Sequence, residues 1–339
     1  MRTTHRICAA LTGAALALGV AAPAAAERWR VGLEEIEGSV QWQYAEEFAK
    51  RIEEKTDGEV TMQLFPYGQL GGLTDIYDAV QSGAIQLAFG SGFLGGTVPE
   101  SQIFSLNFVL TDDQWTNAQI LNDPAFVESE PFVESFRSRG LHPISVVTEG
   151  WQVWSANKPI RSPSDFEGVN IRVMDNRLLR ETYQAYDANP ITIEYGELYS
   201  ALQLGQADAA IQPLFAHQEM GFYEVQSHFI LANQAQFIAT WMGNSDWYDG
   251  LSDEMRGVVN EVADEMVRWA HDMQVALNDE RMKIIMNKKP GMKTVELNVE
   301  ERAVFRERSI PVRDVFGEVT GERGKRLLDT LLKQVELAR

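Results

Sequence analysis

The sequence predicts an α/β protein of two lobes, in which central sheets are flanked by helices and one long helix braces both lobes. Three observations lead to this fold class. Strands alternate with helices near the start of the chain, a helix–glycine–strand unit occurs twice, and one stretch of about 38 residues keeps helical periodicity without a proline. Alternating strands and helices favour parallel strand pairing.

The first lobe begins with two strand–helix units. Apolar residues predict strands at 29–33 and 60–64, where Val60, Met62 and Leu64 alternate with polar residues. The first helix carries Tyr44, Phe48 and Ile52 on one face. Asp57-Gly58 ends this helix, and a second helix places four apolar residues on one face, at Leu73, Ile76, Tyr77 and Val80.

A weak internal repeat relates the two lobes. Residues 77–93 resemble residues 199–215 at a constant offset of 122, with six identities in 17 positions. Both copies read as helix, glycine stop, strand and loop, so we expect one copy in each lobe. Each copy ends with a phenylalanine just past its strand. Because open α/β sheets bind ligands beyond the carboxyl ends of their strands, Phe93 and Phe215 are predicted on opposing walls of a cleft, with core packing as the alternative.

The second half of the chain ends in helices. Residues 252–289 predict a helix of roughly 57 Å, long enough to brace both lobes, and two shorter helices follow at 299–318 and 322–337. We therefore expect lobe 1 at 27–150, with contributions from about 240–290, and lobe 2 at 151–239. A long bridging helix follows at 251–289, and C-terminal helices follow at 290–339.

Residues 1–26 predict a secretory signal. Arg2 and Arg6 precede an apolar stretch, and Ala24-Ala25-Ala26 offers a cleavage site, so we expect cleavage after Ala26 and a periplasmic location. The remaining chain carries 28 basic and 49 acidic residues, a net charge of about −21. This charge repels nucleic acid, which we do not expect as a partner. The only cysteine, Cys8, lies within the signal, which excludes disulfides and thiolate chemistry from the rest.

Catalytic motifs are weak in this sequence. His142, His217, His228 and His271 form no metal-binding spacing, and no nucleophile elbow or phosphate loop occurs. The run at 90–95 matches the dinucleotide pattern Gly-x-Gly-x-x-Gly, but Pro99 follows where a helix must begin. We therefore expect no cofactor, no bound metal and no enzymatic activity; a periplasmic hydrolase remains a weaker alternative.

An arginine interrupts an apolar strand in the middle of the chain. Val169, Ile171 and Val173 alternate as one face of the strand, which places Arg172 on the other. A buried guanidinium needs an anionic partner, and its planar fork suits a carboxylate. Two partners stay open on these grounds. One is the carboxylate of a ligand, and the other is an acid of the protein, at Asp165, Glu167 or Asp175.

Three motifs carry a resemblance to a known family. Residues 66–72 (PYGQLGG), 167–174 (EGVNIRVM) and 195–208 (YGELYSALQLGQAD) are similar to the solute-binding proteins of tripartite ATP-independent periplasmic (TRAP) transporters, the DctP family. The similarity covers nearly the whole chain after the signal. It implies the periplasmic binding protein fold, a receptor that closes on a small carboxylated solute, and delivery of that solute to TRAP permease subunits.

The resemblance also implies ligand-binding residues. Arg172 matches the family arginine that grips the ligand carboxylate, and Tyr195 stands where family members place an aromatic over the ligand. Gln212 occupies the place of a common ligand-binding asparagine. Gln152 stands where dicarboxylate binders carry a second arginine, which argues against a strongly dianionic ligand. Asp175, three residues beyond Arg172, is a further candidate from spacing alone, with solvent exposure as the alternative.

Among subfamilies, the chain is most similar to the ectoine and hydroxyectoine binders, through Glu34-Glu35, residues 64–68 and residues 247–252. This resemblance implies that Glu35, or Glu34 in another register, contacts a cationic ring, and that Phe93, Tyr195 and Phe215 surround it. The expected function is capture of an ectoine-like zwitterion or an organic monoacid for secondary active uptake. A hydroxy acid, keto acid or uronate, and an extracytoplasmic sensor in place of a transport receptor, stay open as alternatives.

Overall fold

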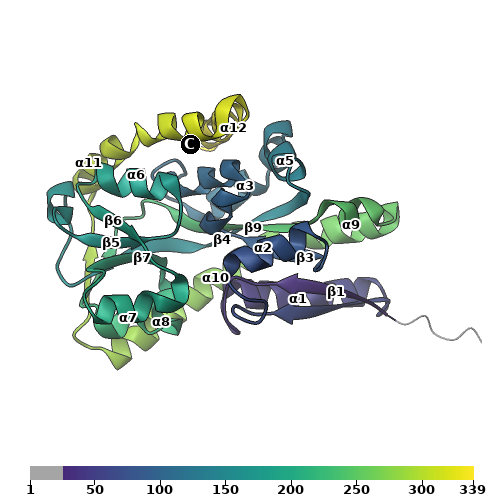
Figure 1. Cartoon of the computed structure of the whole chain (residues 1–339), viewed down its shortest axis with the longest axis horizontal. Coiled ribbons are helices and arrows are strands. Elements are labelled where there is room, and N and C mark those ends of the chain that lie inside the picture. The colour runs from purple at the N-terminus through teal and green to yellow at the C-terminus, as the bar shows by residue number, and fades with distance from the viewer. Residues whose placement is uncertain (1–25) are drawn as a thin grey trace, which may run out of the picture.

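The structure, a computed structural model, describes residues 26–339 (Figure 1). The predicted signal peptide, including Cys8, lies outside the described residues except for Ala26. Within the described range the strands form one mixed sheet system with the order β2-β1-β3-β9-β4-β7-β5-β6; β8 pairs with β4, and β10 pairs with β8. Figure 1 shows β5, β6 and β7 at one end, β1 and β3 at the other, and β4 and β9 between them.

The first half of the sheet has parallel strands joined by helices, as the sequence predicts. β1 (Glu27–Gly32) pairs with β2 (Val60–Phe65) and with β3 (Leu87–Gly90). The connecting helices are α1 (Val40–Lys55) and α2 (Leu73–Gln81). Tyr44, Phe48 and Ile52 of α1 are buried against β1, because their spacing puts them on one face.

The second half repeats this arrangement. β5 (Asn170–Val173) lies between β6 (Asn189–Thr192) and β7 (Ala209–Pro213), all parallel. Its helices are α6 (Arg177–Ala185) and α7 (Leu198–Gln203). Ile171, Arg172 and Val173 of β5 are all buried. Both faces of this strand are covered, as is usual for parallel strands in the middle of a sheet, so Arg172 is buried on the face opposite to Ile171 and Val173.

Two long strands connect the halves. β4 (Leu141–Ala156) and β9 (Gln236–Asn244) run antiparallel, and β4 pairs with β9 near its start and with β7 near its end. Their pairing is shifted between Thr148 and Trp151, at Gly150, whose φ is 109°. The predicted lobe boundary at 150/151 falls on this irregularity. The remaining strands are β8 (His228–Leu231) and β10 (Lys293–Glu296).

Short helices cover the sheet and the loops between its strands. The α-helices among them are α3 (Gln114–Asn122), α4 (Pro124–Val127), α5 (Glu130–Arg137), α8 (Leu214–Glu219) and α9 (Ser245–Gly250). The 3-10 helices are η1 (Gly92–Gly96), η2 (Pro99–Ser105), η3 (Pro163–Phe166), η4 (Tyr195–Glu197) and η5 (Phe222–Val225).

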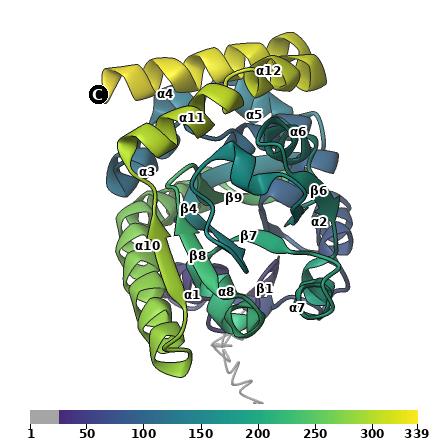
Figure 2. The ribbon, with the colours of Figure 1, turned by 90° about the vertical axis from the view of Figure 1, so that its left-hand side faces the viewer.

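The long helix α10 (Asp253–Lys288) has 36 residues, about 54 Å at 1.5 Å per residue (Figure 2). It packs against α1 and α3 of the first half, against β4, and against α8 of the second. Asn278 makes one such connection, since its Nδ2 donates to the Glu149 carbonyl (3.0 Å) and its Oδ1 accepts from the Phe215 N–H (3.0 Å). The prediction of a long helix is confirmed.

The C-terminal helices differ from the prediction. α11 (Val299–Ser309) ends before Pro311, and α12 (Val312–Leu337) then continues with a non-helical residue at Gly321. The expected interruption between 318 and 322 is present at Gly321, but the break at Ile310–Pro311 was not predicted. Proline lacks the N–H that a continuous helix needs, which accounts for this break.

We expect Gly150→Ala to destabilise the protein. The positive φ strains any side chain, and a Cβ there would come within 2.6 Å of Asn278 Nδ2, so a loss of about 1 to 3 kcal/mol in the free energy of unfolding follows. Urea unfolding followed by circular dichroism measures this loss. In the matched control Gly257→Ala, nothing lies within 4 Å of the new Cβ, and a gain of up to about 1 kcal/mol is expected in α10. Equal effects of the two substitutions would contradict this interpretation.

Candidate functional site

A cavity with an empty volume of about 330 Å³ lies where strands of both halves end. Glu34 and Glu35 follow β1, Ser91 and Phe93 follow β3, and Tyr195 lies in η4. The remaining lining residues come from α2, from β7 and the start of α8, and from β9; they are Leu73, Gln212, Pro213, Phe215, Ala216 and Phe237. The carboxyl ends of parallel strands are the usual place for a ligand in such sheets.

Phe93 and Phe215 both line this cavity, one from each copy of the internal repeat. Tyr195 contributes a third aromatic wall, and its ring meets that of Tyr67 edge to face at 5.7 Å between centroids. Tyr67 follows β2 of the first half and Tyr195 follows β6 of the second. This pair therefore brings the two halves together beside the cavity.

Arg172 lies directly behind the aromatic wall. Its guanidinium carbon is 5.7 Å from the centre of the Phe93 ring, and its side chain is fully buried. Nε donates to the Ile193 carbonyl (2.9 Å), but Nη1 and Nη2 have no hydrogen-bond partner. Burial lowers the Arg172 pKa to about 10, partly opposed by the field of Tyr195, so the group stays charged at neutral pH.

No acid of the described chain forms a salt bridge with Arg172. Asp165 accepts hydrogen bonds from the Arg161 and Ser162 N–H groups, each at 2.9 Å. Asp175 is exposed and pairs with Arg180 (2.7 Å), while Glu167 is exposed. The two free nitrogens of Arg172 form the fork that a carboxylate fits. The sequence left two partners open for Arg172, a protein acid and the carboxylate of a ligand. Within the described residues, none of the three candidate acids is its partner.

Gln212 adds a second unpaired donor at the cavity. It is 3% exposed, and its Nε2 has no partner. Buried amide groups are nearly always hydrogen-bonded in proteins. An acceptor on a bound molecule would satisfy this group.

Glu34 and Glu35 give the cavity an acidic end, and both are buried. Glu34 is already well supplied with donors, because its Oε1 accepts from the Tyr77 hydroxyl and the Ser91 N–H (2.9 Å) and its Oε2 accepts from Gln41 Nε2 (3.2 Å). Glu35 accepts one hydrogen bond, from the Gln41 N–H at the start of α1 (2.9 Å). Glu35 therefore has more acceptor capacity left for a bound molecule than Glu34.

Two further acids lie near Glu35. Glu149 of β4 is fully buried, and burial together with the charge of Glu35 raises its pKa well above the ordinary value. Glu219 of α8 pairs with Arg281 (3.2 Å), yet burial and Glu35 raise its pKa to about 8. Burial likewise raises the pKa of Glu34 and of Glu35. The doublet Glu34-Glu35 signals this acidic region in the sequence, whereas nothing in the sequence places Glu149 beside it.

The structure brings six of the eight predicted site residues together. Glu35, Phe93, Tyr195, Gln212 and Phe215 line the cavity, and Arg172 adjoins it. The other two lie elsewhere. Asp175 forms its surface pair with Arg180, and Gln152, although buried, lies in β4 outside the lining. Ser91 and Phe237 line the cavity but were not predicted.

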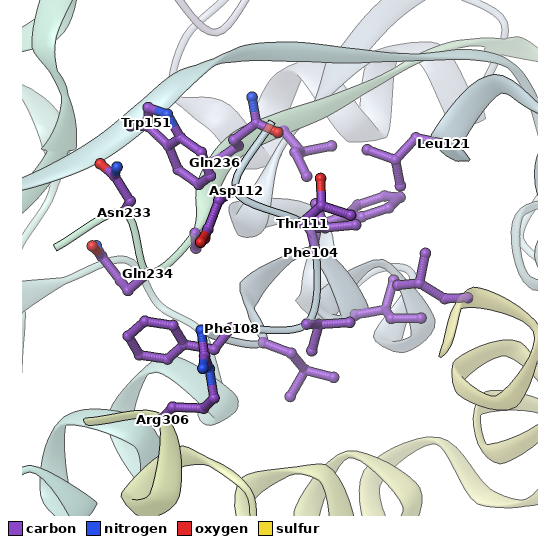
Figure 3. A pocket seen from close by; sticks show the side chains of 17 residues that line it. Phe104, Phe108, Thr111, Asp112, Leu121, Trp151, Asn233, Gln234, Gln236 and Arg306 are labelled. Atoms are coloured by element: carbon purple, nitrogen blue, oxygen red, sulfur yellow. The ribbon is translucent and has the colours of Figure 1, made fainter. Parts of the chain in front are cut away.

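A second cavity, of about 440 Å³, lies along β4 and β9 (Figure 3). Trp151, Gln236, Phe108 and Arg306 line it, together with further apolar and polar residues. Gln236 lines this cavity whereas its neighbour Phe237 lines the first, so the two cavities flank β9 on opposite faces. None of the predicted site residues lines the second cavity.

The fold and the buried cavity between two halves define a two-lobed solute receptor. The profile of the bacterial extracellular solute-binding proteins, family 7 (DctP), matches residues 32–318, and the chain belongs to this family. Members of the family are receptors for small solutes rather than enzymes, and they work with TRAP membrane subunits. The family predicted from the sequence is confirmed.

Three similar proteins illustrate the relationship. The ectoine-binding periplasmic protein TeaA of Halomonas elongata is 34% identical, over 93% of this chain and 92% of its own. The ectoine/5-hydroxyectoine-binding periplasmic protein UehA of Ruegeria pomeroyi is also 34% identical, over 94% of this chain and 93% of its own. The open ligand-free structure of a TRAP solute-binding protein from Marinobacter aquaeolei has a TM-score of 0.85 and 38% identity, over 90% of this chain and 99% of its own.

The acidic region predicts that the free energy of unfolding falls as the pH rises from 7.5 to 8.5. Glu149 and Glu219 have folded pKa values above 4.5, so the folded state binds more protons than the unfolded state in this range. The loss is at most about 1.4 kcal/mol per pH unit for each group, and less for Glu219, which is partly exposed. Urea unfolding of the ligand-free protein at the two pH values measures it.

Buried histidines change the free energy of unfolding in the opposite direction, but at lower pH. Burial lowers the pKa of His142 and of His217 to about 4, so their stabilising contribution increases as unfolded imidazoles lose their protons and is nearly complete by about pH 7.5. The window above pH 7.5 thus isolates the carboxyl groups. A free energy of unfolding that is constant or increases from pH 7.5 to 8.5 would show that the buried acids are ionised in the folded state.

Proposed function

We propose that this chain is a periplasmic TRAP receptor for a small zwitterion of the ectoine type. Arg172 binds the carboxylate, Glu35 binds the cationic end, and Phe93, Tyr195 and Phe215 enclose the body of the solute. The observation that carries the proposal is the pair of buried, unpartnered nitrogens on Arg172. A buried guanidinium without a partner costs several kcal/mol, and a solute carboxylate would offset this cost in the closed receptor.

The opposite charges of the two ends support a zwitterion over a simple anion. A positive group and an acidic cluster adjoin the same cavity. A dianion would bring its second negative charge toward Glu34 and Glu35, and Gln152 provides no positive charge elsewhere. An organic monoacid remains the second candidate, because Arg172 and the unpaired Nε2 of Gln212 alone would bind it.

The structural frame fits capture by closure. We propose lobes at 27–150 and 151–239, with the hinge at the irregular pairing around Gly150 in β4. Cleavage of the signal after Ala26 would release the receptor into the periplasm, where the TRAP permease subunits collect the solute. In this proposal the receptor performs no covalent chemistry.

Replacing Arg172 by alanine should weaken solute binding by roughly 2 to 5 kcal/mol, about 30- to 4,000-fold, because the solute carboxylate is left buried and unpaired. Isothermal titration calorimetry with ectoine, or with the best solute from a thermal-shift screen of zwitterions, monoacids and uronates, measures this loss. Arg180→Ala serves as the control, since Arg180 pairs with the exposed Asp175 away from the cavity. Unchanged affinity in Arg172→Ala would refute the proposal.

The substitution Glu35→Gln separates the two candidate solutes. It should weaken a zwitterion by about 1.5 to 3 kcal/mol, or 10- to 150-fold, because a hydrogen bond between two charged groups is lost. A monoacid should change less than about threefold. Titration of the same variant with ectoine and with a monoacid of similar size gives the comparison. Weakening of both solutes to the same extent would mean that Glu35 does not select for positive charge.

A further inference from the structure

Three buried carboxyl groups meet around one amide side chain. Gln41 Nε2 donates to Glu34 Oε2 and to Glu149 Oε1, each at 3.2 Å, and the Gln41 N–H donates to Glu35 Oε2 (2.9 Å). Glu34, Glu35 and Glu149 are 5%, 7% and 0% exposed. Glu34 and Glu35 follow β1, Glu149 lies in the middle of β4, and Gln41, which joins them, lies at the start of α1.

No positive charge of the described chain forms an ion pair with any of these three carboxyl groups. The nearby titratable groups are Tyr77 and Tyr195, which are neutral phenols, and Glu219, which pairs with Arg281 and whose pKa is raised to about 8. The facing residues of α10, Gln274 and Asn278, are uncharged. Three negative charges in this space would repel one another with little screening by water.

The hydrogen bonds decide which of the three is least able to carry charge. Glu34 accepts from three donors, and Glu35 accepts from the N-terminus of α1, where backbone N–H groups favour an anion. Glu149 accepts only the shared Gln41 Nε2, and its Oε2 is buried without a partner. Glu149 is thus the group on which a proton lowers the electrostatic energy most.

Hydrogen-bond donors without partners also adjoin this cavity. The unpaired Nε2 of Gln212 and the two free nitrogens of Arg172 adjoin it, independently of the acidic cluster. A solute cation placed at Glu35 would supply the positive charge that the cluster lacks. This charge would replace that of a proton bound to the cluster.

We propose that Glu149 holds a proton in the empty receptor and releases it to the solvent when the cationic end of a solute binds Glu35. Glu149 then acts as a positioning residue that makes the cleft selective for cationic ends, without itself lining the cavity. The inference rests on the proposed function, since it requires a solute with a positive end. The proton passes from the Glu149 carboxyl to the buffer, and the solute cation replaces its charge.

Proton release fixes how affinity depends on pH. Binding that releases one proton becomes stronger as the pH rises, by up to tenfold per pH unit, because fewer protons compete with the solute cation. The increase ends once Glu149 is already ionised in the empty receptor. A solute that carries only a carboxylate, such as glucuronate, brings no positive charge and releases no proton.

The test is calorimetric titration of the full protein with ectoine at pH 7 in phosphate and in Tris, two buffers with different ionisation enthalpies. The difference in heat between the buffers counts the protons, and we expect a release of between about one half and one. Glu149→Gln should abolish the release and remove the pH dependence of the dissociation constant. The matched control Glu219→Gln should retain both, although Glu219 also adjoins Glu35 and has a raised pKa.

Two results would overturn the inference. One is ectoine binding with the same heat in both buffers, and the other is proton release that disappears in Glu219→Gln but persists in Glu149→Gln. A receptor that binds no zwitterion at all contradicts the proposed function instead. Even then, infrared spectra of the ligand-free protein test the proton, since the carboxylic acid C=O absorption at pH 7 should decrease in Glu149→Gln by the contribution of one buried carboxyl group. An absorption that is the same in Glu149→Gln and in the unsubstituted protein would also overturn the inference.

Discussion

The unpaired guanidinium of Arg172 is the constraint on which the rest of this structure depends. Its side chain is fully buried, one nitrogen is bonded to the Ile193 carbonyl, and the other two nitrogens have no partner. Such an arrangement is unfavourable in an isolated fold, and in the proposed function the missing partner would arrive with the solute. β6 and β7 pair with β5 on both sides of Arg172, and the hydrogen bond from Nε to the Ile193 carbonyl orients the guanidinium. On this proposal, the cost of burying Arg172 would be offset only when the solute binds.

The acidic cluster complements this arginine from the other half of the fold. Glu34 and Glu35 follow β1, and Gln41 at the start of α1 holds them beside Glu149 of β4. Positive and negative groups therefore adjoin one cavity from different halves. In the proposed closure, each group would lose water as the halves come together. A solute with both charges would compensate both losses, which would relate closure to the charge of the solute.

Much of this arrangement follows from local patterns. Period-two and helical spacings located β1, α1, β2 and α2, and the repeated helix–glycine–strand unit placed Phe93 and Phe215 at one cavity. Local patterns failed where distant segments meet. Phe237 reaches the cavity from β9, and Glu149 reaches the acidic cluster from the middle of β4, and no spacing encodes either approach. Asp175 takes the exposed position that the sequence left open as the alternative, since Arg180, five residues further on, offers it a partner at the surface. The break at Pro311 was overlooked because the apolar spacing continues across it.

A crystal structure of the closed receptor with its solute bound would show directly whether the solute carboxylate is the partner of Arg172. We expect two solute carboxylate oxygens within hydrogen-bond distance of Arg172 Nη1 and Nη2, about 2.7 to 2.9 Å. We also expect the cationic end of the solute next to Glu35. A closed, loaded structure in which a protein carboxylate occupies the fork of Arg172, with the solute bound elsewhere, would contradict this expectation.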